Sequence, residues 1–398
     1  MVLAVEWLLL IVAVALATPT AFVLCECLAV LLPAPPIRRD RARPRLAVLI
    51  PAHNEQTGIS TTLESVLAQT QPGDEVLVVA DNCTDQTARV ADRPGVRVIE
   101  RTDPHRRGKG FALDFGVQSL RAAPPDAVVI LDADCRLEAG ALDALAYRVA
   151  ELNRPLQGRY LMLPPAAAGG WSRISTLAFF MKGPARAGGL ERLGLPCLLG
   201  GTGMIFPWPQ LADAPLASAN LVEDMQLGLD LAIAGHAPRY CSRAVITSDH
   251  PESTRTSLTQ RTRWEHGHLA TLLRQSPRLL LAALRQRRPA LALLALELAV
   301  PPLALLVLLL TGAAAVAASA WLLLGISATP LWILASAGVM LALAVAVCWL
   351  RFARRFVPLG VLLGAPLYAL AKIPLYLRFV RKPEQTWVRT ERSPSEKA

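Results

Sequence analysis

The sequence predicts an α/β domain with a mainly parallel sheet, flanked by transmembrane helices. Hydrophobic residues make up 53% of the 398-residue chain and charged residues only 18%, which is too apolar for an ordinary soluble enzyme. Between apolar regions at either end, residues 46–275 show short apolar segments that alternate with helix-like ones. Such a pattern is typical of a parallel sheet that helices cover on both faces.

The first apolar run predicts an N-terminal transmembrane anchor over residues 1–32. Residues 3–32 are apolar apart from Glu6 and Glu26, and about 20 helical residues are enough to cross a hydrocarbon core. The start of the chain has no basic residue, so a cleaved signal peptide is not indicated. The basic segment 38–45 favours a cytoplasmic location for the domain that follows, because basic flanks of membrane helices stay on that side.

Four apolar segments are predicted to be the strands of the parallel part of the sheet. In open sheets of this kind, ligands bind beyond the carboxyl ends of the strands. The residues that directly follow each strand are therefore the candidates for function. The predicted strands are residues 46–50, 76–80, 96–99 and 127–131.

The first two strands are followed by polar residues suited to a nucleotide. Asn54 and Glu55 follow the first strand in "PAHNE", and Asp81 follows the second in "ADNCTD". Asp81 could accept hydrogen bonds from a base or from ribose hydroxyls. The alternative is a turn or helix-capping role, which is common for an aspartate in this position.

The fourth strand is followed by "DADC", which predicts a metal site. Asp132 and Asp134 are two residues apart in an extended segment, so both can offer oxygens to one hard divalent cation that bridges a diphosphate. The same spacing also occurs by chance in loops. Its place after an apolar strand favours the metal site.

Two further segments are suited to phosphate and substrate. Lys109 lies in a basic, glycine-containing stretch just before a helix, where phosphate oxygens could bind, although a solvated turn is the alternative. The stretch lacks the spacing of a triphosphate-binding loop, so ATP hydrolysis is not supported. Gly201, Thr202 and Gly203 lie in "LLGGTGM", whose glycines allow close approach of a ligand.

Two helical motifs complete the candidate site. Glu223 and Asp224 fall in the first turn of a predicted helix, where the choice is between helix-end electrostatics and a general base. Gln260, Arg263 and Trp264 are spaced i, i+3, i+4, so a helix would present an amide, a guanidinium and an indole to the same neighbour.

The rest of the chain is predicted to associate with the membrane. The net charge is +10, but its basic residues lie beside apolar runs, which favours anionic lipids over nucleic acid as partners. The seven scattered cysteines indicate neither a disulfide framework nor a zinc site. Prolines and Lys372 make the last apolar segment a poor regular span. The predicted segments are an amphipathic interface helix at 277–288, two transmembrane helices within 291–350, a re-entrant, interfacial or further transmembrane segment at 357–377, and a basic cytoplasmic tail at 378–398.

The motifs "PAHNE", "ADNCTD", "LDAD", "VED" and "QRTRW", in this order, resemble the membrane-bound family 2 glycosyltransferases. That family includes cellulose, hyaluronan and poly-N-acetylglucosamine synthases and, more distantly, ceramide glucosyltransferases, and its members are inverting, nucleotide-sugar-dependent enzymes of the GT-A fold. The resemblance implies a GT-A domain over 46–275, with Val222 standing where the family has threonine.

The resemblance also implies roles for individual residues. Asp224 would be the general base, beside Glu223. Asp132 and Asp134 would bind Mg²⁺ or Mn²⁺. The implied donor-binding residues are Asn54, Glu55, Asp81, Lys109, Asp132 and Arg263, and the implied acceptor-binding residues are Gly201, Thr202, Gly203, Gln260 and Trp264.

We therefore expect an inverting transferase in the plasma or inner membrane, with its catalytic domain in the cytoplasm. It would move a sugar from a nucleotide-diphosphate sugar, with UDP as the favoured nucleotide, to a glycan or lipid-linked acceptor in exopolysaccharide or surface polysaccharide synthesis. Membrane lipids and polysaccharide export proteins are the candidate partners. The alternatives are a ceramide-type glycolipid glucosyltransferase and a non-catalytic subunit that binds nucleotide sugar or polysaccharide.

Overall fold

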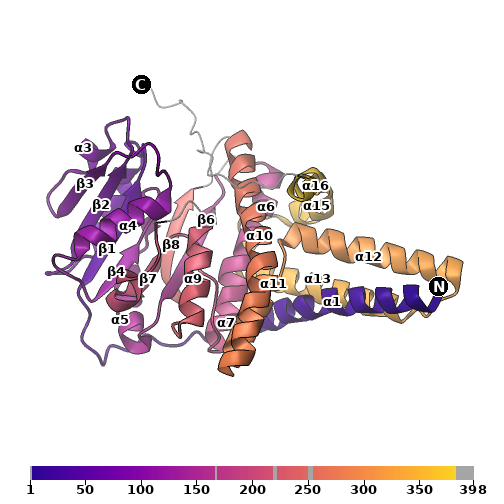
Figure 1. The fold of residues 1–398 in the computed structure, drawn as a ribbon. Helices are drawn as coiled ribbons and strands as arrows, with labels where there is room; N and C mark the ends of the chain where they lie inside the picture. Colours follow the sequence, from indigo (N-terminus) through magenta and orange to yellow (C-terminus); the bar gives the residue numbers. More distant parts are fainter. Residues whose placement is uncertain (1, 166–167, 218–221, 250–253, 382–398) are drawn as a thin grey trace.

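A computed structural model describes residues 2–165, 168–217, 222–249 and 254–381, with side chains omitted for 254–260. An α/β domain forms one end of the molecule and long helices form the other (Figure 1). The beginning of the chain lies at the far end of these helices (Figure 1). The predicted fold class is confirmed.

An eight-stranded mixed sheet forms the domain, in the order β3-β2-β1-β4-β7-β6-β8-β5. The four predicted strands, β1 to β4, run parallel to one another. The second half of the sheet adds antiparallel pairs, since β7 runs against β4 and β6, and β5 against β8. The strands are β1 Leu46–Ala52, β2 Glu75–Asp81, β3 Val96–Arg101, β4 Ala127–Ile130, β5 Arg136–Leu137, β6 Leu156–Leu163, β7 Met204–Pro207 and β8 Arg239–Asp249.

The central strand β1 is buried on both faces because helices cover both sides of the sheet. Alternate residues point to opposite faces of a strand. Val48 and Ile50 therefore pack with α2 and α5, while Leu49 packs with α4 on the other face. Each such buried side chain stabilises the fold by about 1.5–3 kcal/mol. The helices of the domain are α2 Ile59–Leu67, α3 Thr87–Ala91, α4 Lys109–Leu120, α5 Ala141–Leu152, α6 Gly170–Phe180, α7 Gly188–Arg192, α8 Trp208–Ala212 and α9 Glu223–Ile233, with a π-helix, η1, at Met181–Ala187.

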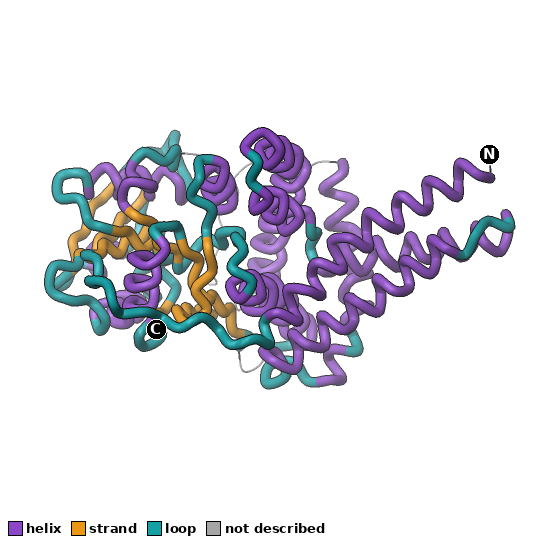
Figure 2. Tube along the Cα trace, turned by 90° about the horizontal axis from the view of Figure 1, so that it is seen from below, coloured by secondary structure: helices purple, strands orange, loops and turns teal. Residues whose placement is uncertain are grey.

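Four described segments are long and apolar enough to cross a membrane. Three of them contain α1 Val2–Ala29, α12 Leu303–Leu324 and α13 Thr329–Cys348, which pack together and extend away from the domain (Figures 1 and 2). The fourth, Leu359–Arg381, is broken into short helices, and its α15 and α16 are seen nearly end-on in Figure 1, across the direction of the bundle. These helices are α14 Leu359–Leu362, α15 Ala365–Ala371 and α16 Ile373–Arg381, after a second π-helix, η2, at Trp349–Ala353.

The segment between domain and bundle differs from the predicted division. Residues 277–288 do not begin a separate helix, because α10 runs from Thr254 to Gln286 through Pro277. The short helix α11, Pro289–Ala299, follows and packs against α10. The helix that carries Arg263 is therefore continuous with the segment expected at the membrane interface.

A buried group of charges joins α1, the predicted anchor, to the domain. We call Glu26 of α1, Arg186 of η1 and Glu297 of α11 the anchor triad. Arg186 Nε donates to a Glu26 carboxylate oxygen at 2.6 Å, and its Nη2 donates to the Glu297 carboxylate. Nearby, a Cβ added to Gly189 would lie 1.9 Å from the Glu26 carbonyl oxygen. The domain therefore packs directly on the backbone of α1.

Candidate active site

Asp132 and Asp134 lie just beyond the end of β4, where the ends of β1 and β2 also meet. The Asp132 backbone N–H donates to Thr202 Oγ1 at 2.9 Å, which ties this loop to the glycine-rich segment before β7. The Asp132 side chain is 35% exposed and Asp134 is exposed. Both carboxylates therefore border solvent at the carboxyl edge of the parallel strands.

This aspartate pair has the chemistry of a divalent cation site. Ligand atoms of Asp132, Asp134 and Cys135 all lie within 4.8 Å of one another. Burial, followed by the charges of the two aspartates, raises the pKa of the Cys135 thiol. Carboxylate oxygens are the ligands that Mg²⁺ and Mn²⁺ prefer. The two aspartates thus fit the expected ion, and Cys135, which sequence analysis did not single out, contributes packing.

Lys109 links the aspartate pair to the glycine-rich segment. Its ammonium donates to Asp132 Oδ1 and to the Gly201 carbonyl oxygen, the latter at 2.5 Å. Burial acts to lower the pKa of Lys109, but the charges of Asp132 and Glu223 outweigh it and raise the pKa. The side chain is therefore a fixed positive charge, with its position set at the first turn of α4.

Residues 200–203 form a loop that leaves little space beside Asp224. Gly201 and Gly203 have φ of 87° and 65°, a left-handed conformation that glycine adopts without strain. A Cβ on Gly201 would lie 3.5 Å from Asp224 Oδ2. Gln157 of β6 fixes this loop, since its Oε1 accepts from Gly200 N at 2.7 Å and its Nε2 donates to Thr202 O at 2.9 Å. Sequence analysis missed Gln157 because a single polar residue in a strand forms no pattern.

Glu223 and Asp224 are the first two residues of α9, and both interact electrostatically with Lys109 and Asp132. Burial and the neighbouring Asp224 raise the pKa of Glu223 to about 7. The charge of Asp224 also acts on Lys109 and Asp132. We call Asp132, Asp134, Glu223 and Asp224 the acidic cluster.

Arg263 is the residue through which α10 interacts with the acidic cluster. Burial lowers the pKa of Arg263, and the charges of Glu223 and Asp132 act in the opposite direction. Trp264, the next residue on α10, is half-buried. The Gln260 side chain lies outside the described part of the chain. Lys109 and Arg263, from α4 and α10, thus supply positive charge beside carboxylates from β4 and α9.

The residues after β1 and β2 are engaged with each other. The Asn54 amide accepts from Thr84 N at 2.7 Å and donates to Thr84 Oγ1 at 3.0 Å. The Glu55 N–H donates to Thr87 Oγ1 at 2.7 Å. These contacts hold the two loops together at the edge of the sheet.

Asp81 is buried in a salt bridge that the sequence did not indicate. Its Oδ1 accepts from Arg101 Nη1 at 2.6 Å and from the Asn82 side chain at 3.0 Å. Arg101 ends the neighbouring strand β3, so its partnership with Asp81 follows from the register of the two strands. Any contact of Asp81 with a nucleotide would be made from within this network.

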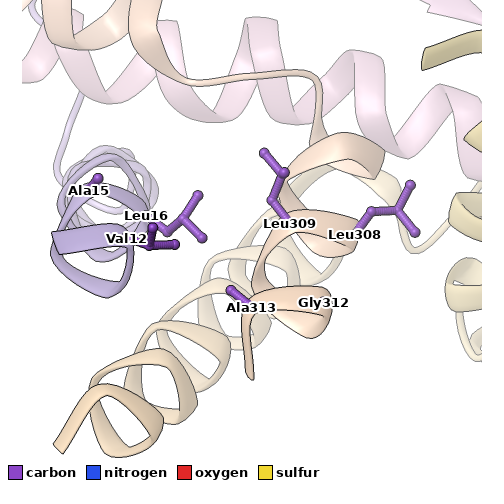
Figure 3. Close-up of a pocket in the computed structure, with 7 residues that line it drawn as sticks. All are labelled: Val12, Ala15, Leu16, Leu308, Leu309, Gly312 and Ala313. Carbon is purple, nitrogen blue, oxygen red and sulfur yellow. The ribbon is translucent and has the colours of Figure 1, made fainter. Parts of the chain in front are cut away.

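The cavity shown in Figure 3 is separate from the acidic cluster. It has a volume of about 390 Å³ and lies between α1 and α12, far along the membrane part of the chain. Its lining is apolar and consists of Val12, Ala15, Leu16, Leu308, Leu309, Gly312 and Ala313. Such a surface offers no group for acid–base or phosphate chemistry, so the candidate active site is the acidic cluster at the strand ends.

The fold and this arrangement of charges define a GT-A-type transferase domain attached to apolar helices. Residues 44–267 match the family model described as glycosyltransferase-like family 2, and the chain belongs to this family.

Curated relatives are also glycosyltransferases. A probable glycosyltransferase of Bacillus subtilis (strain 168), YdaM, is 26% identical over 262 residues, which cover 58% of this chain and 57% of the relative. The 4,4'-diaponeurosporenoate glycosyltransferase of Staphylococcus aureus (strain USA300) is 39% identical over 92 residues, covering 22% and 24%. The chain thus spans about half or less of the length of these relatives.

A solved structure shares the architecture. The mannosyltransferase PcManGT from Pyrobaculum calidifontis, in complex with GDP-Man and Mn²⁺, aligns over 94% of this chain and 100% of its own, with a TM-score of 0.55 and 19% identity. At this identity the likeness shows the fold alone.

Proposed function

We propose that this protein is an inverting glycosyltransferase that moves a sugar from a nucleotide-diphosphate sugar, with UDP favoured, to a glycan or lipid-linked acceptor. The observation that carries the proposal is that Lys109 binds Asp132 beyond the ends of the parallel strands, with Glu223, Asp224 and Arg263 close enough to act on these two charges. Positive groups suit a diphosphate, and carboxylates suit a cation and a general base. A protein of this fold binds GDP-Man with Mn²⁺, which supports the same ligand class here.

The residues of this chain divide the reaction between them. Lys109 and Arg263 stabilise charge that grows on the leaving diphosphate. Asp224 accepts the proton of the acceptor hydroxyl as that oxygen attacks the anomeric carbon. Gly201 lies beside Asp224, where we place the acceptor. Asp132 and Asp134 would hold a divalent ion, which would supply Lewis-acid stabilisation of the diphosphate.

One direct displacement inverts the configuration of the transferred sugar. The attack comes from the face opposite the leaving group, so an α-linked donor gives a β-linked product. We place this chemistry at the cytoplasmic face of the membrane, because the basic segment 38–45 separates α1 from the domain. Surface polysaccharide synthesis is the process that we propose, with a ceramide-type glycolipid product as the alternative.

The test is release of nucleotide diphosphate by the full-length protein in detergent. UDP-, GDP- and dTDP-sugars are supplied with Mg²⁺ or Mn²⁺, together with oligosaccharide or lipid extracts as acceptors. We expect release from one donor, and its loss in Asp224→Asn and Asp134→Ala. The matched control is Asp213→Asn, whose carboxylate is 87% exposed on the surface and pairs only loosely with Arg121.

Each outcome separates the proposals. Transfer to a lipid but not to a glycan would favour the glycolipid alternative. Release that survives in both variants would contradict the assigned base and metal ligands. No release from any donor, with nucleotide-sugar binding retained, would favour the non-catalytic subunit.

A further inference from the structure

The C-terminal helices α15 and α16 pack against the stretch of α10 that carries Arg263 and Trp264. Tyr368 of α15, Lys372 between the two helices and Tyr376 of α16 all contact α10. These contacts fall within residues 261–266 of α10. The contact joins the last described helices of the chain to the candidate active site.

Glu265 is the centre of this contact. One of its carboxylate oxygens accepts from the Lys372 ammonium, and the other accepts from the Tyr376 hydroxyl at 2.8 Å. The Glu265 and Lys372 side chains are 15% and 13% exposed, so water screens the pair only weakly. Charge-assisted hydrogen bonds of this kind are about twice as strong as neutral ones.

Neighbouring residues extend the contact along α10. The His266 ring pairs its Nε2 with the Leu375 carbonyl oxygen at 3.0 Å and packs edge to face on Phe379, with ring centroids 5.3 Å apart. Arg261 Nη1 donates to the Tyr368 hydroxyl at 3.5 Å. The C-terminal helices therefore contact a full turn of α10.

The helical geometry of α10 places Arg263 on the face opposite the contact with α15 and α16. Residues two apart on a helix point roughly 200° away from each other. Arg261 and Glu265 face α15 and α16, so Arg263, which lies midway between them in sequence, faces the other way. The charges of Glu223 and Asp132 act on Arg263, whereas Arg261 and Glu265 contact the C-terminal helices. A displacement of Glu265 would therefore displace the Arg263 guanidinium.

The opposite face of α15 and α16 is suited to a lipid surface. These helices run across the direction of α1, α12 and α13 (Figures 1 and 2). Helices that are apolar on one side and basic at the edge lie at the headgroup level of membranes. Here the exposed residues are Leu363, Leu367, Leu370, Ile373, Leu377 and Val380, with Arg378 and Arg381 beside them.

We propose that Glu265 is a positioning residue that ties the Arg263–Trp264 segment to helices seated on anionic lipid. The leaving-group side of the active site is complete only when α15 and α16 lie on the membrane. This inference rests on the proposed function for its kinetic test, and hydrogen exchange tests it without turnover.

The kinetic experiment compares Glu265→Gln with the full-length wild type in vesicles of phosphatidylcholine and phosphatidylglycerol. We expect kcat to fall at least tenfold while the KM for the donor changes less than threefold. In the charge-reversed single variants Glu265→Lys and Lys372→Glu, kcat should fall further. In the double variant that carries both substitutions, most of the lost kcat should return. Glu64→Gln, whose side chain is 71% exposed, is the matched control.

The exchange experiment follows the amides of residues 261–270 with and without vesicles. We expect vesicles to slow exchange there in the wild type and not in Glu265→Gln. Tyr376→Phe, which removes one hydroxyl, replaces Glu265→Gln if that variant fails to fold, and should show a smaller effect of the same kind.

Unchanged exchange in the wild type on adding vesicles would overturn the inference. An unchanged kcat in Glu265→Gln beside an active wild type would do the same. An inactive wild type whose amides are protected by vesicles would instead count against the proposed function and support the membrane link.

Discussion

The anchor triad and the acidic cluster are two groups of charged residues that the fold treats in opposite ways. In the triad, one guanidinium lies between two carboxylates, and the side chains of Arg186, Glu26 and Glu297 are 7%, 0% and 4% exposed. In the acidic cluster, the charges of Asp132 and Glu223 act on both Lys109 and Arg263, and Asp134 is exposed to solvent.

The difference separates a structural use of charge from a functional one. A closed, buried ion pair contributes to the assembly of a fold, and removing one partner leaves a costly buried charge. An open cluster with more negative than positive groups costs stability, which a bound cation offsets. Substitutions in the two groups should therefore affect different measurements.

The largest effect on activity is expected from Asp224→Asn. Loss of a general base lowers kcat by about 10²–10⁴-fold. The melting temperature should not fall, because the variant removes negative charge from a crowded site. Nucleotide release and thermal melting on the same sample check both statements, and a kcat within tenfold of the wild type would refute the role of Asp224.

The largest effect on stability is expected from Arg186→Met. The substitution leaves Glu26 and Glu297 buried without their shared partner, which costs about 3–5 kcal/mol. Denaturant unfolding in detergent measures this loss. The kcat per folded molecule should stay near that of the wild type. A stable variant with low kcat would show that the triad also serves catalysis.

Gly189→Ala should destabilise the contact between α7 and α1. Its Cβ would lie 1.9 Å from the Glu26 carbonyl oxygen, so the backbones must separate, at a cost of about 1–3 kcal/mol. The same measurement on Gly312→Ala is the control, because nothing lies within 4 Å of a Cβ there. Equal melting temperatures for the two variants would contradict the close packing.

The smallest effect is expected from Glu223→Gln and depends on pH. The pKa of Glu223 is raised to about 7 from its ordinary value of 4.5, so between these values the folded state holds a proton that the unfolded state has lost. Stability of the wild type should therefore fall as pH rises through this window. Glu223→Gln has no carboxyl group to ionise and so does not lose stability in this way. The melting temperature of the variant should therefore rise relative to that of the wild type from pH 4.5 to 7. Parallel curves would contradict the raised pKa.

The sequence predicts the parallel half of the sheet well, because β1 to β4 are apolar runs with polar residues at their ends. It does not predict β6 and β8, where Gln157, Arg159 and Arg243 interrupt the apolar pattern. It also divides α10 at Pro277, although the helix continues, since packing of α10 on α9 and α11 outweighs the local effect of proline.

For the candidate site, the sequence indicates which residues are candidates for function but not which side chains they contact. Asp132 and Asp134 stand out by spacing, and Lys109 by its place before α4. The pairing of Asp81 with Arg101 depends on strand register, and that of Glu265 with Lys372 joins residues 107 apart. Contacts of this kind come from tertiary packing, which local patterns do not encode.

The anchor triad also constrains the order in which the protein can be assembled during synthesis. Arg186 meets one partner 160 residues earlier and another 111 residues later in the chain. The first helix is therefore synthesised long before the last member of the triad leaves the ribosome. Glu26 therefore lacks its partner until Arg186 has been synthesised, and a chain stopped short of Glu297 would leave Arg186 with only one of its two carboxylates.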